Sequence, residues 1–178
     1  MAINQARNDG QLKKMLAIPL QEAVKYVMED IWAENKTFIM ETVYFAGTPE
    51  VYERTYDTNP EASFENAWDF NVWNIAYSKI EGKFFYAPNN MSVGNEINGQ
   101  HTSVVDGGDS RQYLAEIIYE GLAGRIFGNG FWTEERNAFK ALEKWLGKEN
   151  LKKSFEKGMD KAGLQYKCHN APMQARKD

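Results

Sequence analysis

An amphipathic pattern over residues 19–43 constrains this chain more than any other feature. Apolar side chains recur there at three- and four-residue steps, the spacing that places them on one face of an α-helix. Pro19 suits a first helical turn, where its missing N–H is not needed. The sequence therefore predicts a long helix that buries one face. The residues of that face are Leu20, Val24, Val27, Met28, Ile31, Phe38, Ile39 and Thr42.

Before this helix, residues 1–18 are predicted to form a polar N-terminal arm, in which 11–17 could make a short helix. Residues 44–66 lose the helical period and contain Gly and Pro, which is typical of a loop. The same is expected of residues 89–108.

Alternation of apolar and polar side chains over residues 68–77 predicts a β-strand. The phase of the alternation slips by one position near Val72 and Trp73, which predicts a β-bulge there. Glu81 and Gly82 would form the turn into a second strand over residues 83–86. Together these segments predict a hairpin.

Three further helices are predicted in the C-terminal half. The first begins near residue 110 and ends at Gly128, and the second is capped by Thr133 and ends at Gly147. The third runs from Lys148 to a C-terminal cap at Gly163.

The predicted fold class is therefore α+β, with a long N-terminal helix and C-terminal helices packed on a small antiparallel sheet. A chain of 178 residues can bury a core as one domain, which we place at residues 19–164. Residues 165–178 are expected to be a polar, flexible tail. No apolar run reaches the roughly 18 residues that a membrane span needs.

Charge is distributed unevenly along the chain. Residues 134–178 hold 11 basic and 7 acidic side chains, whereas residues 1–133 hold 10 and 18. Lysines recur on the last helices at about four-residue steps, and Lys152, Lys153 and Lys157 form the centre of this basic stripe. It predicts either a solvated helix face or a surface that orients a partner.

Residue types used in catalysis occur, but in patterns that do not predict an enzyme. His101, Ser103 and Asp106 lie within one glycine-rich segment, whereas the members of a hydrolase triad usually come from separate elements. Glu53 and Asp57 would be the carboxylate pair of a glycosidase, a pattern too common to be specific.

Metal and cofactor sites are not predicted either. Cys168 and His169 are adjacent in the tail, and the only other histidine is far away in sequence, so no zinc-ligand spacing exists. The glycine-rich phosphate-binding motifs are absent. With one cysteine, the chain cannot form an internal disulfide.

The segment that follows the long helix carries the most specific motif in the chain. Its residues are Val43, Tyr44, Pro49, Tyr52, Arg54 and Thr55. They match the pattern Val-Tyr-x-x-Tyr-x-Pro-x-x-Tyr-x-Arg-Thr, except that the central tyrosine is missing, where residues 46–48 read Ala-Gly-Thr. The segment thereby resembles a family of tailed-bacteriophage neck and tail-completion proteins, in which a helix leads into this pattern.

The resemblance implies a structural virion protein without catalytic residues or cofactors, made in the host cytoplasm. It would form a ring of identical copies at the head-to-tail junction, between the portal-side connector and the tail. DNA would pass through the ring without sequence recognition. Two alternatives are a lysozyme-like phage cell-wall hydrolase and a bacterial protein-binding module.

Aromatic residues and arginine anchor protein interfaces well, so the matching segment is also a candidate contact surface. Its side chains would contact a partner or, alternatively, hold the loop to its own domain. In the ring, the basic stripe of one copy would face acidic surface of the next. The candidate interface residues are Tyr44, Tyr52, Arg54, Thr55, Tyr56, Lys152, Lys153 and Lys157.

Overall fold

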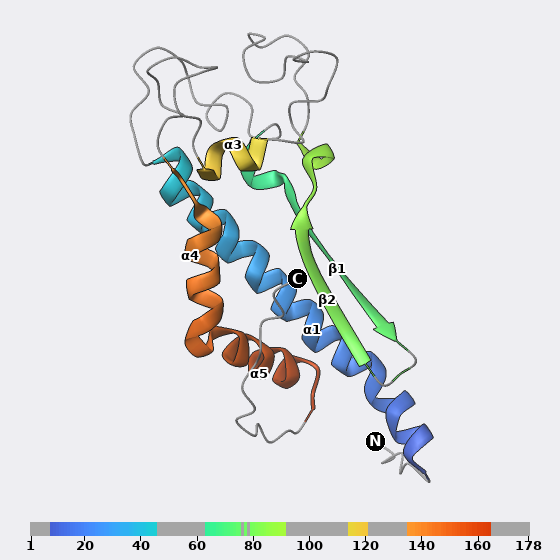
Figure 1. Ribbon diagram of the computed structural model, residues 1–178. Helices are drawn as coiled ribbons and strands as arrows, with labels where there is room; N and C mark the ends of the chain where they lie inside the picture. The colour runs from blue at the N-terminus through green and yellow to red at the C-terminus, as the bar shows by residue number, and fades with distance from the viewer. Residues whose placement is uncertain are drawn as a thin grey trace, which may run out of the picture.

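The protein is built around one long helix. The computed structural model describes residues 8–45, 63–75, 77, 79–91, 114–120 and 135–164. A hairpin lies along one side of helix α1, and two helices joined at an angle lie along another (Figure 1). This is the predicted α+β class. The main elements are α1 (Asp9–Ile39), β1 (Trp68–Ile75), β2 (Lys79–Tyr86), α3 (Leu114–Glu120), α4 (Ala138–Trp145) and α5 (Leu151–Lys161).

Helix α1 begins ten residues earlier than the sequence predicts. The Asn8 side chain caps it by accepting the N–H of Gln11 at 2.9 Å. Pro19 lies inside the helix instead of at its start. Its missing N–H would have bonded to the carbonyl of Met15, and Met15 is exposed, so water can take that place. Residues 9–18, expected in the N-terminal arm, are thus helical.

The hairpin is confirmed, but its predicted bulge is wrong. The strands pair one to one from Trp68 opposite Tyr86 to Ile75 opposite Lys79. The apparent change of phase arises because Trp73 and Ile75 are apolar residues on the outer, solvent-exposed face of a regular strand.

The predicted turn is also displaced. Gly82 lies within β2, opposite Val72, and the turn falls between Ile75 and Lys79. A Cβ atom on Gly82 would lie 2.5 Å from Sδ of Met28, so the strand approaches α1 closely there and a larger residue would require the Met28 side chain to move.

Helices α4 and α5 are joined at an angle by a π-helical segment (Leu146–Asn150), in which Glu149 has φ of 61° (Figure 1). The Asn137 side chain caps α4 by accepting the N–H of Lys140 at 2.9 Å, so the helix does not begin after Thr133. Helix α4 ends at Trp145, so the predicted boundary between two helices is confirmed but displaced by two residues from Gly147.

The predicted cap at Gly163 is confirmed. Gly163 has φ of 70°, and its N–H donates to the carbonyl of Asp160 at 3.0 Å. The N–H of Leu164 donates to the carbonyl of Met159 at 3.0 Å. These two bonds form a Schellman motif, which requires the left-handed conformation that glycine tolerates.

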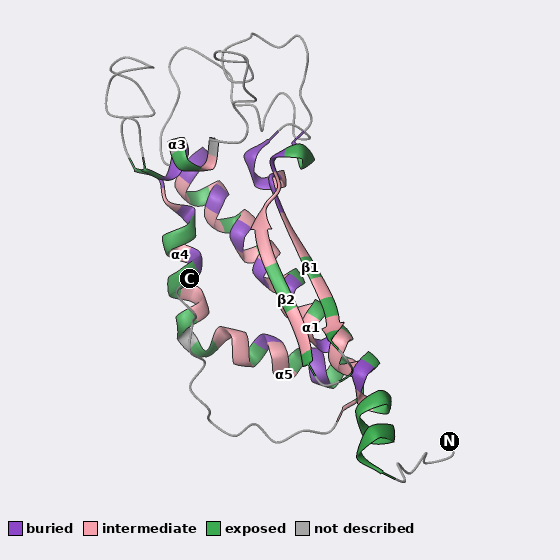
Figure 2. Cartoon of the chain, turned by 45° about the vertical axis from the view of Figure 1, so that its right-hand side comes forward, coloured by how far each residue is buried: buried purple, intermediate pink, exposed green. Residues whose placement is uncertain are grey.

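Two groups of buried side chains lie along α1 (Figure 2). The larger group is aromatic: the Trp68 ring stacks on Phe84 and Tyr119, with ring centroids 5.4 and 6.0 Å away. It covers the C-terminal end of α1, where Ile39 is fully buried. The smaller group joins Met28 and other α1 residues to α4 and the strands.

The backbones of α1 and α5 come into direct contact. A Cβ atom on Gly158 would lie 2.6 Å from the carbonyl oxygen of Ala23 and 3.1 Å from its Cα. One turn before Gly158, the Ser154 hydroxyl donates to the Asp30 carboxylate. Only glycine allows the helices to approach this closely.

Replacing this glycine is expected to destabilise the fold. Gly158→Ala forces the two helices apart and should lower the free energy of unfolding by about 1–3 kcal/mol. Gly147→Ala is the matched control, because nothing lies within 4 Å of the added carbon. It should leave stability unchanged or raise it slightly. Urea unfolding measures the free energy for both variants. Equal effects of the two substitutions would contradict the close contact between Gly158 and Ala23.

Candidate interaction surfaces

The predicted interface motif is described at one residue. Tyr44 ends the π-helix that extends α1 (Met40–Tyr44) and is only 9% exposed. Its hydroxyl accepts the N–H of Phe64 at 2.6 Å, which ties the end of α1 to the segment before β1. Tyr44 therefore holds its own domain together. The rest of the motif, Tyr52, Arg54, Thr55 and Tyr56, lies outside the described residues.

Two buried tyrosines differ in how their hydroxyls are satisfied. Burial, and then the charge of Glu65, raises the pKa of Tyr44 far above its ordinary value. Burial likewise raises the pKa of Tyr119, helped by the nearby Tyr86. Both phenols stay protonated at neutral pH. Among the described residues, the Tyr119 hydroxyl has no hydrogen-bond partner, in contrast to that of Tyr44.

The predicted basic stripe lies partly on α5. Lys153 and Lys157 are exposed one turn apart, while Lys152 is half-buried. Lys161, the next residue in the series, lies 3.9 Å above the Tyr26 ring. On α5, the exposed centre of the stripe is therefore the pair Lys153 and Lys157.

The other candidates are not described. His101, Ser103 and Asp106 lie outside the described ranges, as do Glu53 and Asp57. The same holds for Cys168 and His169. Within the ranges given above, no three His, Cys, Asp or Glu side chains are grouped to hold a metal ion. None of the described helices has the length and apolar character to cross a membrane.

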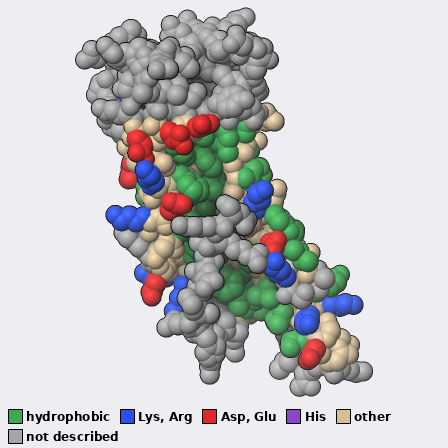
Figure 3. Space-filling model, in the orientation of Figure 1, with side chains coloured by type: hydrophobic (Ala, Val, Ile, Leu, Met, Phe, Trp, Pro, Cys, Tyr) green, Lys and Arg blue, Asp and Glu red, His purple; other side chains and the backbone are tan. Residues whose placement is uncertain are grey.

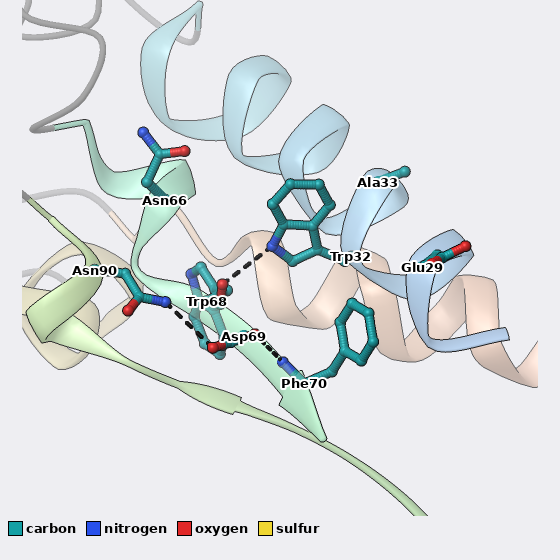
Figure 4. Close-up of a pocket in the computed structure, with 8 residues that line it drawn as sticks. All are labelled: Glu29, Trp32, Ala33, Asn66, Trp68, Asp69, Phe70 and Asn90. Atoms are coloured by element: carbon teal, nitrogen blue, oxygen red, sulfur yellow. Dashed lines mark hydrogen bonds between the residues drawn. The ribbon is translucent and has the colours of Figure 1, made fainter. Parts of the chain in front are cut away.

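A groove of about 900 Å³ opens between α1 and the start of β1 (Figure 4). The Trp32 indole N–H donates to the carbonyl of Trp68 at 3.0 Å across the groove. Lys36 lies 3.8 Å above the Trp32 ring, and its amine is 3.2 Å from the side-chain oxygen of Asn66. The residues lining this α1–β1 groove are Glu29, Trp32, Ala33, Asn66, Trp68, Asp69, Phe70 and Asn90.

The strand edge at this groove is already partly satisfied. The carbonyl of Trp68 accepts from Trp32, and the N–H of Phe70 donates to its neighbour Asp69 at 2.7 Å. These bonds occupy backbone groups that an added strand would use. The groove is therefore suited to side chains more than to β-strand addition.

A second surface lies at the end of the molecule where the hairpin turns. The amine of Lys14 lies 5.9 Å from the centre of the Tyr77 ring, so the first turns of α1 adjoin the hairpin tip. Figure 3 shows apolar and basic side chains together at this end. We call Lys14, Ile18, Ile75, Tyr77 and Lys79 the hairpin-tip surface.

This end of the molecule, which includes the hairpin-tip surface, is unusually apolar for a part exposed to solvent. Six of the eight exposed large apolar side chains in the described part belong to this end, and Ile18 is 71% exposed. The six are Leu12, Met15, Ile18, Trp73, Ile75 and Tyr77. In the sequence, the signal for this apolar end was the apolar residues Trp73 and Ile75, which also produce the apparent slip of phase in the strand.

No protein-family model matches the chain, and no curated protein or solved structure shows significant similarity to it. The comparisons therefore leave the resemblance to neck and tail-completion proteins as an expectation.

The two buried tyrosines allow a matched test of these contacts. Tyr44→Phe leaves the Phe64 N–H without its buried acceptor and should cost about 1–3 kcal/mol of unfolding free energy. Tyr119→Phe removes a hydroxyl that has no partner and should leave stability unchanged or raise it. Thermal and urea unfolding at pH 7 measure both. A larger loss for Tyr119→Phe would contradict this assignment.

Proposed function

We propose that this chain is a structural protein of a tailed bacteriophage, a neck, connector or tail-completion component. It would form a ring of identical copies at the head-to-tail junction. The observation that carries the proposal is the apolar surface at the hairpin tip and the start of α1. An exposed surface of this kind is suited to contact between proteins.

The exposed apolar side chains at this end support such a role. The exposed fractions of the six large ones amount to about three whole side chains, on the order of 600 Å² at about 200 Å² each. This total is spread over the first turns of α1 and the outer face of the hairpin, so one contact would use part of it.

The resemblance supports the particular assembly. Residues 43–55 match most of the family pattern directly after a long helix, the position in which the family has it. The partners would be copies of the chain, the portal-side connector and tail proteins, with DNA passing through the ring. Exposed Lys153 and Lys157 would set the orientation of neighbouring copies and add little binding energy.

Sedimentation velocity and negative-stain imaging test the proposal. The purified chain should form rings when it is mixed with the purified connector, which raises its local concentration, whereas the chain alone can stay monomeric. A chain that stays monomeric with the connector would contradict the ring. Lysis of purified peptidoglycan that disappears in Glu53→Gln would instead establish the hydrolase alternative.

A charge-reversal variant tests the role of the basic stripe in this assay. Replacing Lys152, Lys153 and Lys157 by Glu should slow ring formation at low salt, with the circular dichroism spectrum unchanged. Assembly at the wild-type rate would show that the stripe is only a solvated helix face.

A further inference from the structure

The geometry points to a specific contact between copies: the hairpin-tip surface of one copy binds in the α1–β1 groove of the next. The occupant of the groove is thus a second copy of this chain. This inference rests on the ring proposed above and names the surfaces that form it. Each copy would use its tip toward one neighbour and its groove toward the other.

In a single copy of the chain, Tyr77 has an unfavourable backbone conformation and an exposed ring. It has φ of 58°, in the left-handed region that favours glycine and asparagine, and its side chain is 55% exposed. A large aromatic residue in this conformation costs folding free energy and gains little from burial in its own chain. A contact with another molecule would bury the ring and offset that cost.

The groove offers a matching apolar surface. Trp32, Trp68 and Phe70 line it, and α1 contributes the small side chain of Ala33 at its margin. Its volume of about 900 Å³ can receive an aromatic ring together with neighbouring side chains. Other exposed large apolar residues in the described part, Phe45 and Phe139, do not line this groove.

Charges at the two surfaces are complementary. Lys14 and Lys79 flank Tyr77 at the tip, and both are exposed. Glu29 and Asp69 line the groove, and Lys36 lies over its Trp32 ring, bonded to Asn66. Two of these charges also have charged partners in their own chain. Lys79 pairs with Glu81, and the amine of Lys25 lies 3.9 Å from a carboxylate oxygen of Glu29. These exposed pairs are weak, so the charges can still orient an approaching copy.

The positions of the two surfaces fit a ring. Lys14 and Trp32 are 18 positions apart on α1, a separation of about 27 Å at 1.5 Å per residue. Tip and groove are different surfaces. When two copies bind, one tip and one groove therefore remain unoccupied at the two ends of the pair. Such heterologous contacts continue from copy to copy and close into a ring when the rotation allows. A tip that bound another tip would stop at a dimer.

A complementation experiment tests this arrangement. The tip variant combines Ile18→Glu with Tyr77→Asn; asparagine tolerates the left-handed conformation, so the fold should be retained. The groove variant is Ala33→Arg, an exposed helix position where arginine can pair with Glu29 one turn away. Circular dichroism and thermal unfolding verify both folds.

Assembly is followed by sedimentation velocity under conditions in which the wild-type chain assembles, on the connector if it is required. The association constant of each variant alone should fall at least about tenfold, since each variant lacks one side of every contact. Mixed in equal amounts, the variants should form a dimer, because the intact tip of the groove variant meets the intact groove of the tip variant.

The other outcomes overturn the inference in distinguishable ways. If both variants assemble like wild type, the contact lies elsewhere and the ring itself is unaffected. If each variant blocks assembly but mixing restores nothing, the surfaces do not bind each other. If the wild-type chain itself never assembles, the proposed function fails before this inference is reached.

Discussion

A two-stranded hairpin is not stable in water by itself, and the whole architecture depends on how α1 supplies what the hairpin lacks. The inner face of the strands packs on this helix, and α4 and α5 pack along it as well. Close approach is achieved at two glycines: Gly82 lies against Met28, and Gly158 lies against Ala23. A side chain at Gly158 would press on the backbone of α1 and separate the helices, whereas one at Gly82 would displace the Met28 side chain.

Packing on one helix also determines what remains exposed. Because the hairpin runs along α1, its turn lies beside the first helical turns, where Lys14 reaches the Tyr77 ring. At its other end, the strand lies beside Trp32, and the groove forms between them. The same framework thus presents an apolar tip and an aromatic groove about 27 Å apart along α1.

Much of the fold was predictable from local patterns. Helical spacing predicted α1, and Gly163 predicted the end of α5, because both follow from residues close in sequence. The start of α1 was missed because Pro19 is tolerated inside an exposed turn. The strand register was missed because Trp73 and Ile75 are apolar on the outer face.

The candidate surfaces were less predictable. Trp32 bonds to a strand 36 residues away, and nothing local indicates that contact. The left-handed conformation of Tyr77 follows from where the turn falls, which depends on the register. Cross-linking with a short bismaleimide tests the central claim directly, using Lys79→Cys, which is exposed beside Tyr77 and leaves that ring in place, and Ala33→Cys, each combined with Cys168→Ser. Cross-linked dimers should form when the two variants are mixed under assembly conditions and be scarce with either variant alone; equal yields in all three samples, or none in the mixture, would contradict the account.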